Sequence, residues 1–180
     1  HSKNGVRPEV WKLPEEAPAS VLYNGQSFAV MMVTPADLED FAIGFSITEG
    51  IAATPKEIGS IRIAEAADGF LINVEVDARA LERAEGRRRT LTGRSGCGIC
   101  GAQSLDAVMK PLARVRGIWP EAAAIEKAFE TMPSMQIMNL ENRSTHAAAF
   151  CDLSGAVELV REDIGRHNAL DKLAGALGRE

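Results

Sequence analysis

The sequence has few cysteines for disulfide bonds and no long apolar segment for membrane insertion. It has three cysteines in 180 residues, an odd number that is too small for a disulfide scaffold. No apolar run is long enough to span a bilayer, and the opening residues HSKNGVRPEVWKLPEE lack the apolar core of a signal peptide. We therefore expect a cytoplasmic protein with no membrane partner, whose thiols react or bind metal instead of forming structural disulfides.

An excess of positive charge is also missing. Twenty Lys and Arg residues face 25 Asp and Glu residues, so the net charge is −5 and gives no reason to expect nucleic-acid binding. Hydrophobic residues make up 46 % of the chain. That content is enough for the core of one domain or of two small ones.

The first half of the chain has the signals of two β-hairpins. Residues 21–34 are rich in strand-forming residues and turn at Asn24-Gly25. A second hairpin turns at Asp68-Gly69 and continues into residues 70–76, where apolar and polar residues alternate. Both patterns predict antiparallel strands, and the alternation in residues 70–76 predicts one buried face for that strand.

A helix is expected between the two hairpins. Thr34 is a suitable N-cap, Pro35 suits the first helical position, and Gly50 suits the stop. Residues 1–90 therefore predict a small α+β domain with antiparallel strands.

Beyond Thr90 the helix and strand signals alternate, which favours an α/β layered domain over residues 91–180. A helix is expected from Ala102, and a second between Pro120 and Pro133. Strands are expected at 146–151 and 156–161, followed by a last helix. The apolar residues expected to face inward on the second and last helices are Ile125, Ala128, Phe129, Met132, Leu170, Leu173, Ala174 and Leu177.

The most reactive segment is TGRSGCGICG, residues 92–101. It holds Cys97 and Cys100 as a CxxC pair among four glycines, which let another molecule approach the main chain closely. Arg94 places positive charge beside thiols whose nucleophilic form is the thiolate. These features predict sulfur chemistry at the two cysteines.

Other uses of the CxxC pair remain open. A structural zinc site needs two more ligands, and the candidates are Cys151 with His146 or His167. A thioredoxin-like pair normally opens a helix after a strand in a fold that begins βαβ, whereas this pair follows two hairpins. A glycine-rich turn with incidental thiols would be an oxidation liability without a use. Cys151 itself lies in an apolar run and is expected to be a buried, inert thiol.

A second polar segment, REDIGRHN at residues 161–168, falls at an expected strand-to-helix junction. It is either a solvated, salt-bridged helix start or an anion or nucleotide site. In the second case the backbone amides at the helix start, with Arg166 and His167, suit phosphate. Asp163 or Asn168 would then read a ribose or a base edge.

Four segments, taken in order, resemble the FdhD family of formate dehydrogenase accessory sulfurtransferases. They are YNGQSFAVMMVTPADLEDFAIGFSITEG (23–50), LTGRSGCGICG (91–101), THAAAF (145–150) and VREDIGRHNALDKLAGAL (160–177). The resemblance extends from about Leu13 to Leu177. It implies a fold whose C-terminal part is similar to cytidine deaminases, and a chain truncated at its C-terminus.

The resemblance also implies a reaction. Family members take persulfide sulfur from a cysteine desulfurase and pass it to the molybdenum or tungsten bis-guanine-dinucleotide cofactor that formate dehydrogenase requires. The sulfur carrier of the family maps onto Cys97, with Cys100 as its partner. The alternative is a chaperone that binds this cofactor without transferring sulfur.

The resemblance further implies the partners and the ligand. The expected partners are the desulfurase, the catalytic subunit of formate dehydrogenase and a second copy of the chain. GDP would mimic the cofactor, and no permanently bound metal is expected. The expected cofactor-binding residues are Arg94, Asp163, Arg166, His167 and Asn168.

Deamination, which the expected fold would otherwise suggest, lacks its motifs. Zinc deaminases use H-x-E or C-x-E with P-C-x-x-C, where the glutamate moves the proton. Gly96 precedes Cys97 in place of proline, and His146-Ala147-Ala148 has no glutamate. The sequence therefore argues against a deaminase.

Overall fold

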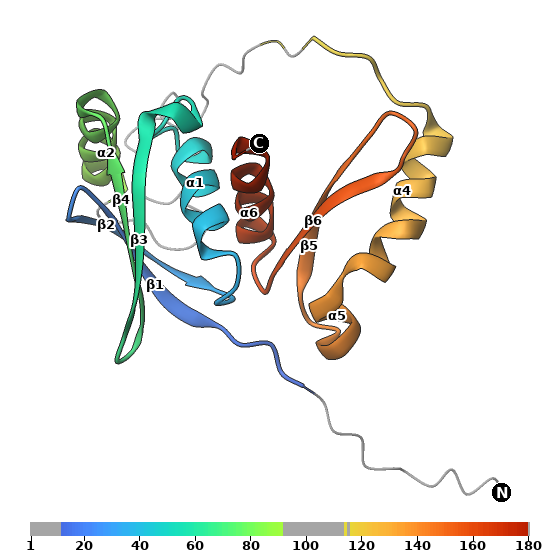
Figure 1. Ribbon diagram of the computed structural model, residues 1–180, viewed down its shortest axis with the longest axis horizontal. Coiled ribbons are helices and arrows are strands. Elements are labelled where there is room, and N and C mark those ends of the chain that lie inside the picture. The colour runs from blue at the N-terminus through green and yellow to red at the C-terminus, as the bar shows by residue number, and fades with distance from the viewer. Residues whose placement is uncertain (1–11, 92–113, 115, 180) are drawn as a thin grey trace, which may run out of the picture.

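The computed structural model describes residues 12–91, 114 and 116–179. From left to right in Figure 1, the chain forms a four-stranded sheet, helices α1 (Leu38–Thr48) and α6 (Arg166–Gly178), a two-stranded sheet, and helices α4 (Ala122–Met135) and α5 (Ile137–Asn142). The expectation of a mixed α and β fold is confirmed. None of the described helices is long and apolar enough to cross a membrane.

The four-stranded sheet contains both predicted hairpins. Strands β1 (Ala17–Tyr23) and β2 (Gln26–Val33) turn at Asn24-Gly25, and both turn residues have the positive φ angles that such tight turns need. Strands β3 (Ile58–Ala66) and β4 (Gly69–Val76) form the second hairpin. The strand order is β2-β1-β4-β3.

The two hairpins join through β1 and β4, which pair in parallel from Ala19↔Phe70 to Tyr23↔Val74. The sheet is therefore mixed, where the sequence predicted antiparallel strands alone. Turn residues specify pairing only inside each hairpin. The crossover through α1, which starts β3 in the same direction as β2, decides how the hairpins meet.

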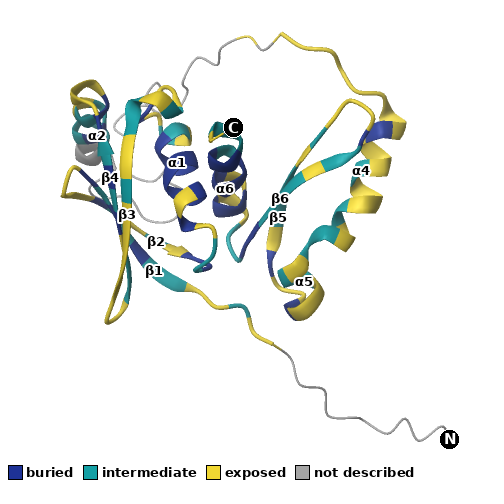
Figure 2. Cartoon of the chain, viewed as in Figure 1, coloured by how far each residue is buried: buried dark blue, intermediate teal, exposed yellow. Residues whose placement is uncertain are grey.

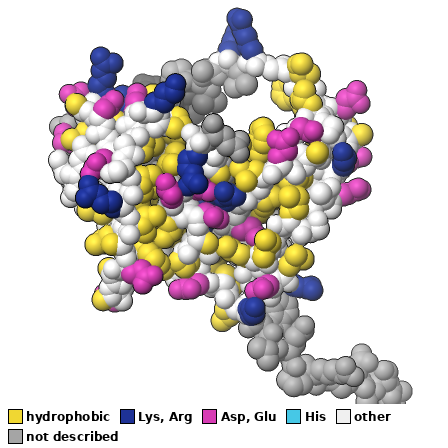
Figure 3. Space-filling model, viewed as in Figure 1, with side chains coloured by type: hydrophobic (Ala, Val, Ile, Leu, Met, Phe, Trp, Pro, Cys, Tyr) yellow, Lys and Arg dark blue, Asp and Glu magenta, His cyan; other side chains and the backbone are white. Residues whose placement is uncertain are grey.

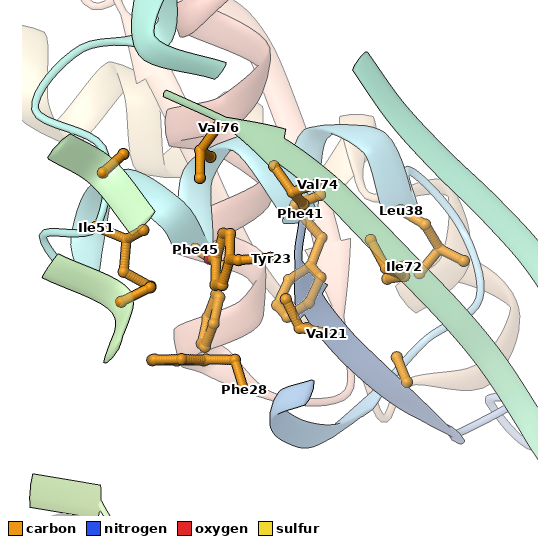
Figure 4. Packing of buried hydrophobic residues seen from close by; sticks show 14 of the residues in the cluster. Val21, Tyr23, Phe28, Leu38, Phe41, Phe45, Ile51, Ile72, Val74 and Val76 are labelled. Carbon is orange, nitrogen blue, oxygen red and sulfur yellow. The ribbon is translucent and has the colours of Figure 1, made fainter. Parts of the chain in front are cut away.

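The main core lies between this sheet and α1 (Figure 4). Phe45 of α1 packs against Phe41 and, edge to face, against Phe28 of β2, with ring centroids 5.4 and 6.1 Å apart. Tyr23 completes the group, edge to face with Phe28 at 5.3 Å. The aliphatic part of the core comes from alternate positions of β1 and β4, as predicted for β4: Ala19, Val21, Ile72, Val74 and Val76.

Helix α1 begins later than the sequence predicts. Asp37, with φ of 52°, precedes the first helical residue Leu38, and no side chain caps the helix. Thr34 lies four residues before Leu38 and does not cap the helix; its hydroxyl instead accepts a hydrogen bond from the backbone N–H of Ile164, at 3.0 Å. The predicted stop at Gly50 is confirmed by its φ of 71°.

Helix α2 (Ala78–Leu91) was not predicted from the sequence. Asp77 starts it, because its carboxylate accepts a hydrogen bond from the Ala80 N–H at 2.8 Å. Only two of its alanines, Ala80 and Ala84, belong to the main core. Because the helix needs few apolar residues for this small contact, its sequence shows little of the apolar periodicity by which a helix is predicted.

The second half is built on a hairpin of β5 (His146–Cys151) and β6 (Val157–Asp163), as predicted. Its turn packs closely on α4. Gly155 of the turn lies so near the backbone of Ala124 that an added Cβ would overlap it. The predicted stop at Pro133 is wrong by two residues. Helix α4 runs on to Met135, with Pro133 inside its last turn. The helix expected from Ala102 lies outside the described residues.

The apolar face of α4 is not buried as expected. Figure 2 shows α4 mostly exposed while α1 and α6 are mostly buried. Ile125 and Phe129 are 46 % and 70 % exposed. They line a cavity of about 600 Å³ together with residues of β5 and α6. Figure 3 shows several places where hydrophobic side chains reach the visible surface.

Two other expectations fail at this cavity. Cys151 is half-buried and lines the cavity, so it is not a core thiol. Leu170 is 55 % exposed and also lines it. The buried face of α6 differs from the predicted one. The prediction counted only apolar residues, whereas the buried face includes the polar residue Lys172. Its buried members are Asn168, Ala169, Asp171, Lys172, Leu173, Gly175 and Ala176.

Helices α1 and α6 cross in direct backbone contact. A Cβ on Gly44 of α1 would overlap the backbone carbonyl of Asp171, and a Cβ on Gly175 of α6 would overlap the carbonyl of Asp40. The distance between packed helices depends on the side chains at the crossing, and two glycines bring these backbones unusually close. The crossing joins the two halves of the chain.

Gly44→Ala or Gly175→Ala should lower the free energy of unfolding by about 3 kcal/mol or more, because the added methyl group meets rigid backbone. Urea unfolding followed by circular dichroism measures the change. Gly86→Ala in α2 is the matched control, since nothing lies within 4 Å of its added Cβ. It should raise stability by about 0.5–1 kcal/mol. Equal effects at Gly44 and Gly86 would contradict the close crossing.

Asp171 makes the same interface sensitive to pH. Burial raises the pKa of Asp171 to about 6, although the Thr48 hydroxyl donates to its carboxylate at 2.8 Å, and Glu49 adds to the rise. Because the pKa is higher in the folded chain, the folded state holds more protons between about pH 4 and pH 6. The contribution of Asp171 to stability therefore falls as pH rises through this range.

Asp171→Asn keeps an acceptor for Thr48 and removes the buried charge. We expect it to raise the free energy of unfolding by about 1–3 kcal/mol at pH 8, and to have little effect at pH 4. Urea titrations at the two pH values test this. Asp68→Asn, at an exposed hairpin turn, serves as control. A gain from Asp171→Asn that is the same at both pH values would contradict the mechanism.

Candidate functional site

The predicted site residues fall into two groups. Cys97, Cys100 and Arg94 lie outside the described residues, so their roles stay predictions. Asp163, Arg166, His167 and Asn168 all lie where β6 ends and α6 begins. The structure thus brings these four together, as their spacing in the sequence requires.

Asp163 is the centre of this junction and is fully buried. One of its oxygens, Oδ1, accepts from the Gly165 N–H at 2.8 Å and from the Asn168 amide at 3.0 Å. The other, Oδ2, accepts from the Thr34 N–H at 2.9 Å and pairs with Lys172 Nζ at 2.7 Å. The cost of burying a carboxylate is offset only when its oxygens find partners, and this one has two partners on each oxygen.

Lys172 is also fully buried and its ammonium group is satisfied. Besides Asp163, it donates to the backbone carbonyls of Thr34 at 3.0 Å and Glu162 at 3.3 Å. An ammonium group has three donors and no acceptor, so these three contacts use its capacity. The charge pair is therefore part of the protein interior.

Asn168 and Glu162 also have structural partners. The Asn168 side-chain amide donates to the Met32 carbonyl at 2.7 Å as well as to Asp163. The Glu162 carboxylate accepts from the N–H groups of Met138 and Asn139, both at 2.8 Å, and so caps the start of α5. Both acids of the REDIG segment are thus buried and belong to the protein interior, so they are not part of a solvated surface.

Arg166 and His167 differ from these residues because both are exposed, in the first turn of α6. The residue that precedes the helix is Gly165, which has no side chain to cap the first N–H groups. The partial positive charge of a helix start therefore coincides with an arginine and a histidine. This arrangement suits an anion.

Sequence analysis missed the roles that three polar residues play at this junction: Thr34, Lys172 and Glu162. Lys172 carried one usable signal, an ionisable residue within an apolar helix. Thr34 and Glu162 bond to backbone groups of segments far along the chain, which no local pattern reveals. Among the described residues, no group of three His, Cys, Asp or Glu side chains is placed to hold a metal ion.

The large cavity and this junction are separate places. The cavity is lined mainly by α4 and β5, and none of the four junction residues contributes to it. Its lining is largely apolar, whereas the junction presents charged groups. We base the candidate site on the junction because its chemistry matches a charged ligand.

A family model and curated relatives match most of this chain, and all of them belong to the same family. The FdhD/NarQ family model matches residues 14–180. The sulfur carrier protein FdhD of Bordetella petrii is 43 % identical over 177 residues, which is 98 % of this chain and 64 % of the relative. The sulfur carrier protein FdhD of Cupriavidus necator is 47 % identical over 167 residues, covering 92 % of this chain and 58 % of the relative.

A solved structure shares the fold. A crystal structure from Desulfotalea psychrophila, assigned as a formate dehydrogenase accessory protein, superposes with a TM-score of 0.62 at 21 % identity. The match covers 92 % of this chain and 59 % of that one. The chain thus spans about 60 % of the length of the relatives it matches. With a family match from residue 14 to residue 180, the chain belongs to the FdhD/NarQ family.

Proposed function

We propose that this protein is a sulfur carrier that receives persulfide sulfur on Cys97 and delivers it to the molybdenum or tungsten bis-guanine-dinucleotide cofactor. The observation that carries the proposal is the similarity, at 43–47 % identity, to proteins named as sulfur carriers. The glycine-flanked CxxC pair supplies the chemistry that such a role needs. The cofactor is the substrate, and formate dehydrogenase is its destination.

Loading is a thiol exchange. The Cys97 thiolate attacks the outer sulfur of a cysteine persulfide on the desulfurase, the S–S bond breaks, and the desulfurase cysteine leaves as a thiolate. Cys97 then carries a persulfide. Arg94, three residues before Cys97 in the sequence, favours the attacking thiolate by its positive charge.

Release uses the second cysteine. The Cys100 thiolate attacks the inner sulfur of the Cys97 persulfide, and the outer sulfur leaves as hydrosulfide. The two cysteines end as a disulfide, so they supply the two electrons that reduce the released sulfur. A cellular reductant of the thiol class then restores the pair.

The junction of β6 and α6 is proposed to bind the cofactor during transfer. Arg166 and His167 are exposed beside uncapped N–H groups, which suits the phosphates of a guanine dinucleotide. Asp163 and Asn168 shape this loop from inside. A chaperone that only holds the cofactor would need the same surface but no reactive Cys97.

Cys97→Ala should abolish loading, since the persulfide forms on that sulfur. Incubation with a cysteine desulfurase and free cysteine, followed by intact-mass measurement, should show one added sulfur on the wild type and none on the variant. Cys151→Ala, which removes the thiol beside the apolar cavity, should load normally. Reductant-sensitive sulfur on Cys97→Ala at the wild-type level would reject the carrier and leave the cofactor chaperone.

Arg166→Ala should weaken binding of GDP, used as a probe for the cofactor, by about 1.5–3 kcal/mol, because a charge-assisted hydrogen bond to phosphate is lost. Titration calorimetry measures the affinity. Arg62→Ala, on β3, removes the same charge at another exposed position and should leave the affinity unchanged. If Arg166→Ala binds GDP as tightly as the wild type does, the proposed surface is wrong.

A further inference from the structure

Thr34, the residue after β2, forms hydrogen bonds to the β6 and α6 segments through its N–H, hydroxyl and carbonyl, and its carbonyl also accepts from the Ala36 N–H at 2.7 Å. Its N–H donates to Asp163 Oδ2 at 2.9 Å, its hydroxyl accepts from the Ile164 N–H at 3.0 Å, and its carbonyl accepts from Lys172 Nζ at 3.0 Å. Thr34 is only 6 % exposed. A residue of the first half of the chain therefore holds a loop that lies about 130 positions further on.

We propose that Thr34 is a positioning residue for the anion-binding surface formed by Arg166 and His167. The inference rests on the proposed function, since that function supplies the ligand. Thr34 touches no ligand in this scheme. It acts by fixing the backbone that leads into α6.

The fixed backbone immediately precedes the exposed pair. The N–H of Ile164 is held by the Thr34 hydroxyl, and the N–H of Gly165 is held by Asp163, which Thr34 also contacts. Arg166 is the next residue. The direction in which α6 starts, and thus where its first two side chains project, follows from these hydrogen bonds.

The first turns of α6 are held to the same strand end. Asn168 donates to the carbonyl of Met32, and Lys172 donates to the carbonyl of Thr34. Pro35 follows Thr34 and keeps it out of helical conformations, so the groups of Thr34 stay extended toward α6. The four-stranded sheet thus acts as the rigid support of the surface.

The hydroxyl can be tested without disturbing the other contacts. Thr34→Val has nearly the same shape and keeps the backbone N–H and carbonyl, but leaves the Ile164 N–H without its acceptor. Thr34→Ser restores the hydroxyl. Asn24→Ala, at the opposite end of the same hairpin, removes two hydrogen bonds to Val76 and is the control for a general loss of stability.

Two measurements are made on all four proteins, the GDP affinity by calorimetry and the amide exchange of Ile164 and Gly165 by NMR. For Thr34→Val we expect about a five- to tenfold loss of affinity and at least about tenfold faster exchange at both amides. Thr34→Ser should stay within about twofold of the wild type. Asn24→Ala should change neither quantity beyond its effect on global stability.

The outcomes separate the two proposals. Wild-type affinity in Thr34→Val overturns the positioning role, whatever the exchange rates show. Loss of affinity that Asn24→Ala reproduces overturns it too, because the effect is then one of stability. If the wild type itself fails to bind GDP, the ligand of the proposed surface is wrong and both proposals fall. Rescue by Thr34→Ser of both quantities supports the positioning role.

Discussion

The buried charge pair between Asp163 and Lys172 is the interaction on which the arrangement of this chain depends. Removing two charges from water is costly, and the cost is offset only when every donor and acceptor finds a partner. Here those partners come from Thr34 directly after β2, from Glu162 in β6 and from Asn168 in α6. The three elements must therefore meet in one geometry, and the loop of the candidate site takes its shape from that meeting.

The second interaction that joins the two halves of the chain is the close crossing of α1 and α6. Gly44 and Gly175 let the helix backbones touch, and their closeness places Asp171 against the end of α1. A carboxylate in that position is held where solvent does not stabilise its charge. The same close packing that joins the halves thus buries a carboxyl group and raises its pKa to about 6.

Local chemistry made much of the fold predictable. Asn24-Gly25 and Gly50 adopt the left-handed conformations their residue types favour, and the alternation in residues 70–76 marked a strand with one buried face. The family was also recognisable from four ordered motifs. These features depend on neighbours in sequence, which is why they could be seen.

Interactions between distant segments were not predictable. Thr34 has the residue type and the position before Pro35 that favour an N-cap, yet its hydroxyl accepts a hydrogen bond from the Ile164 N–H. Lys172 lies in a helix whose apolar spacing suggested a different buried face. Of the candidate site, the sequence located Asp163 and Asn168 correctly at the junction but gave no sign that both bond to the interior. Their partners include the backbone of Thr34 and of Met32, which lie about 130 residues earlier in the chain.

The hydrogen bond between Lys172 and Thr34 spans 138 residues. Contacts of such sequence separation form late, because a long loop must close before they contribute any stability. During synthesis the first sheet emerges from the ribosome well before α6 exists. The backbone N–H of Thr34, whose partner is Asp163, must then remain hydrated beside the end of β2 until β6 and α6 have emerged.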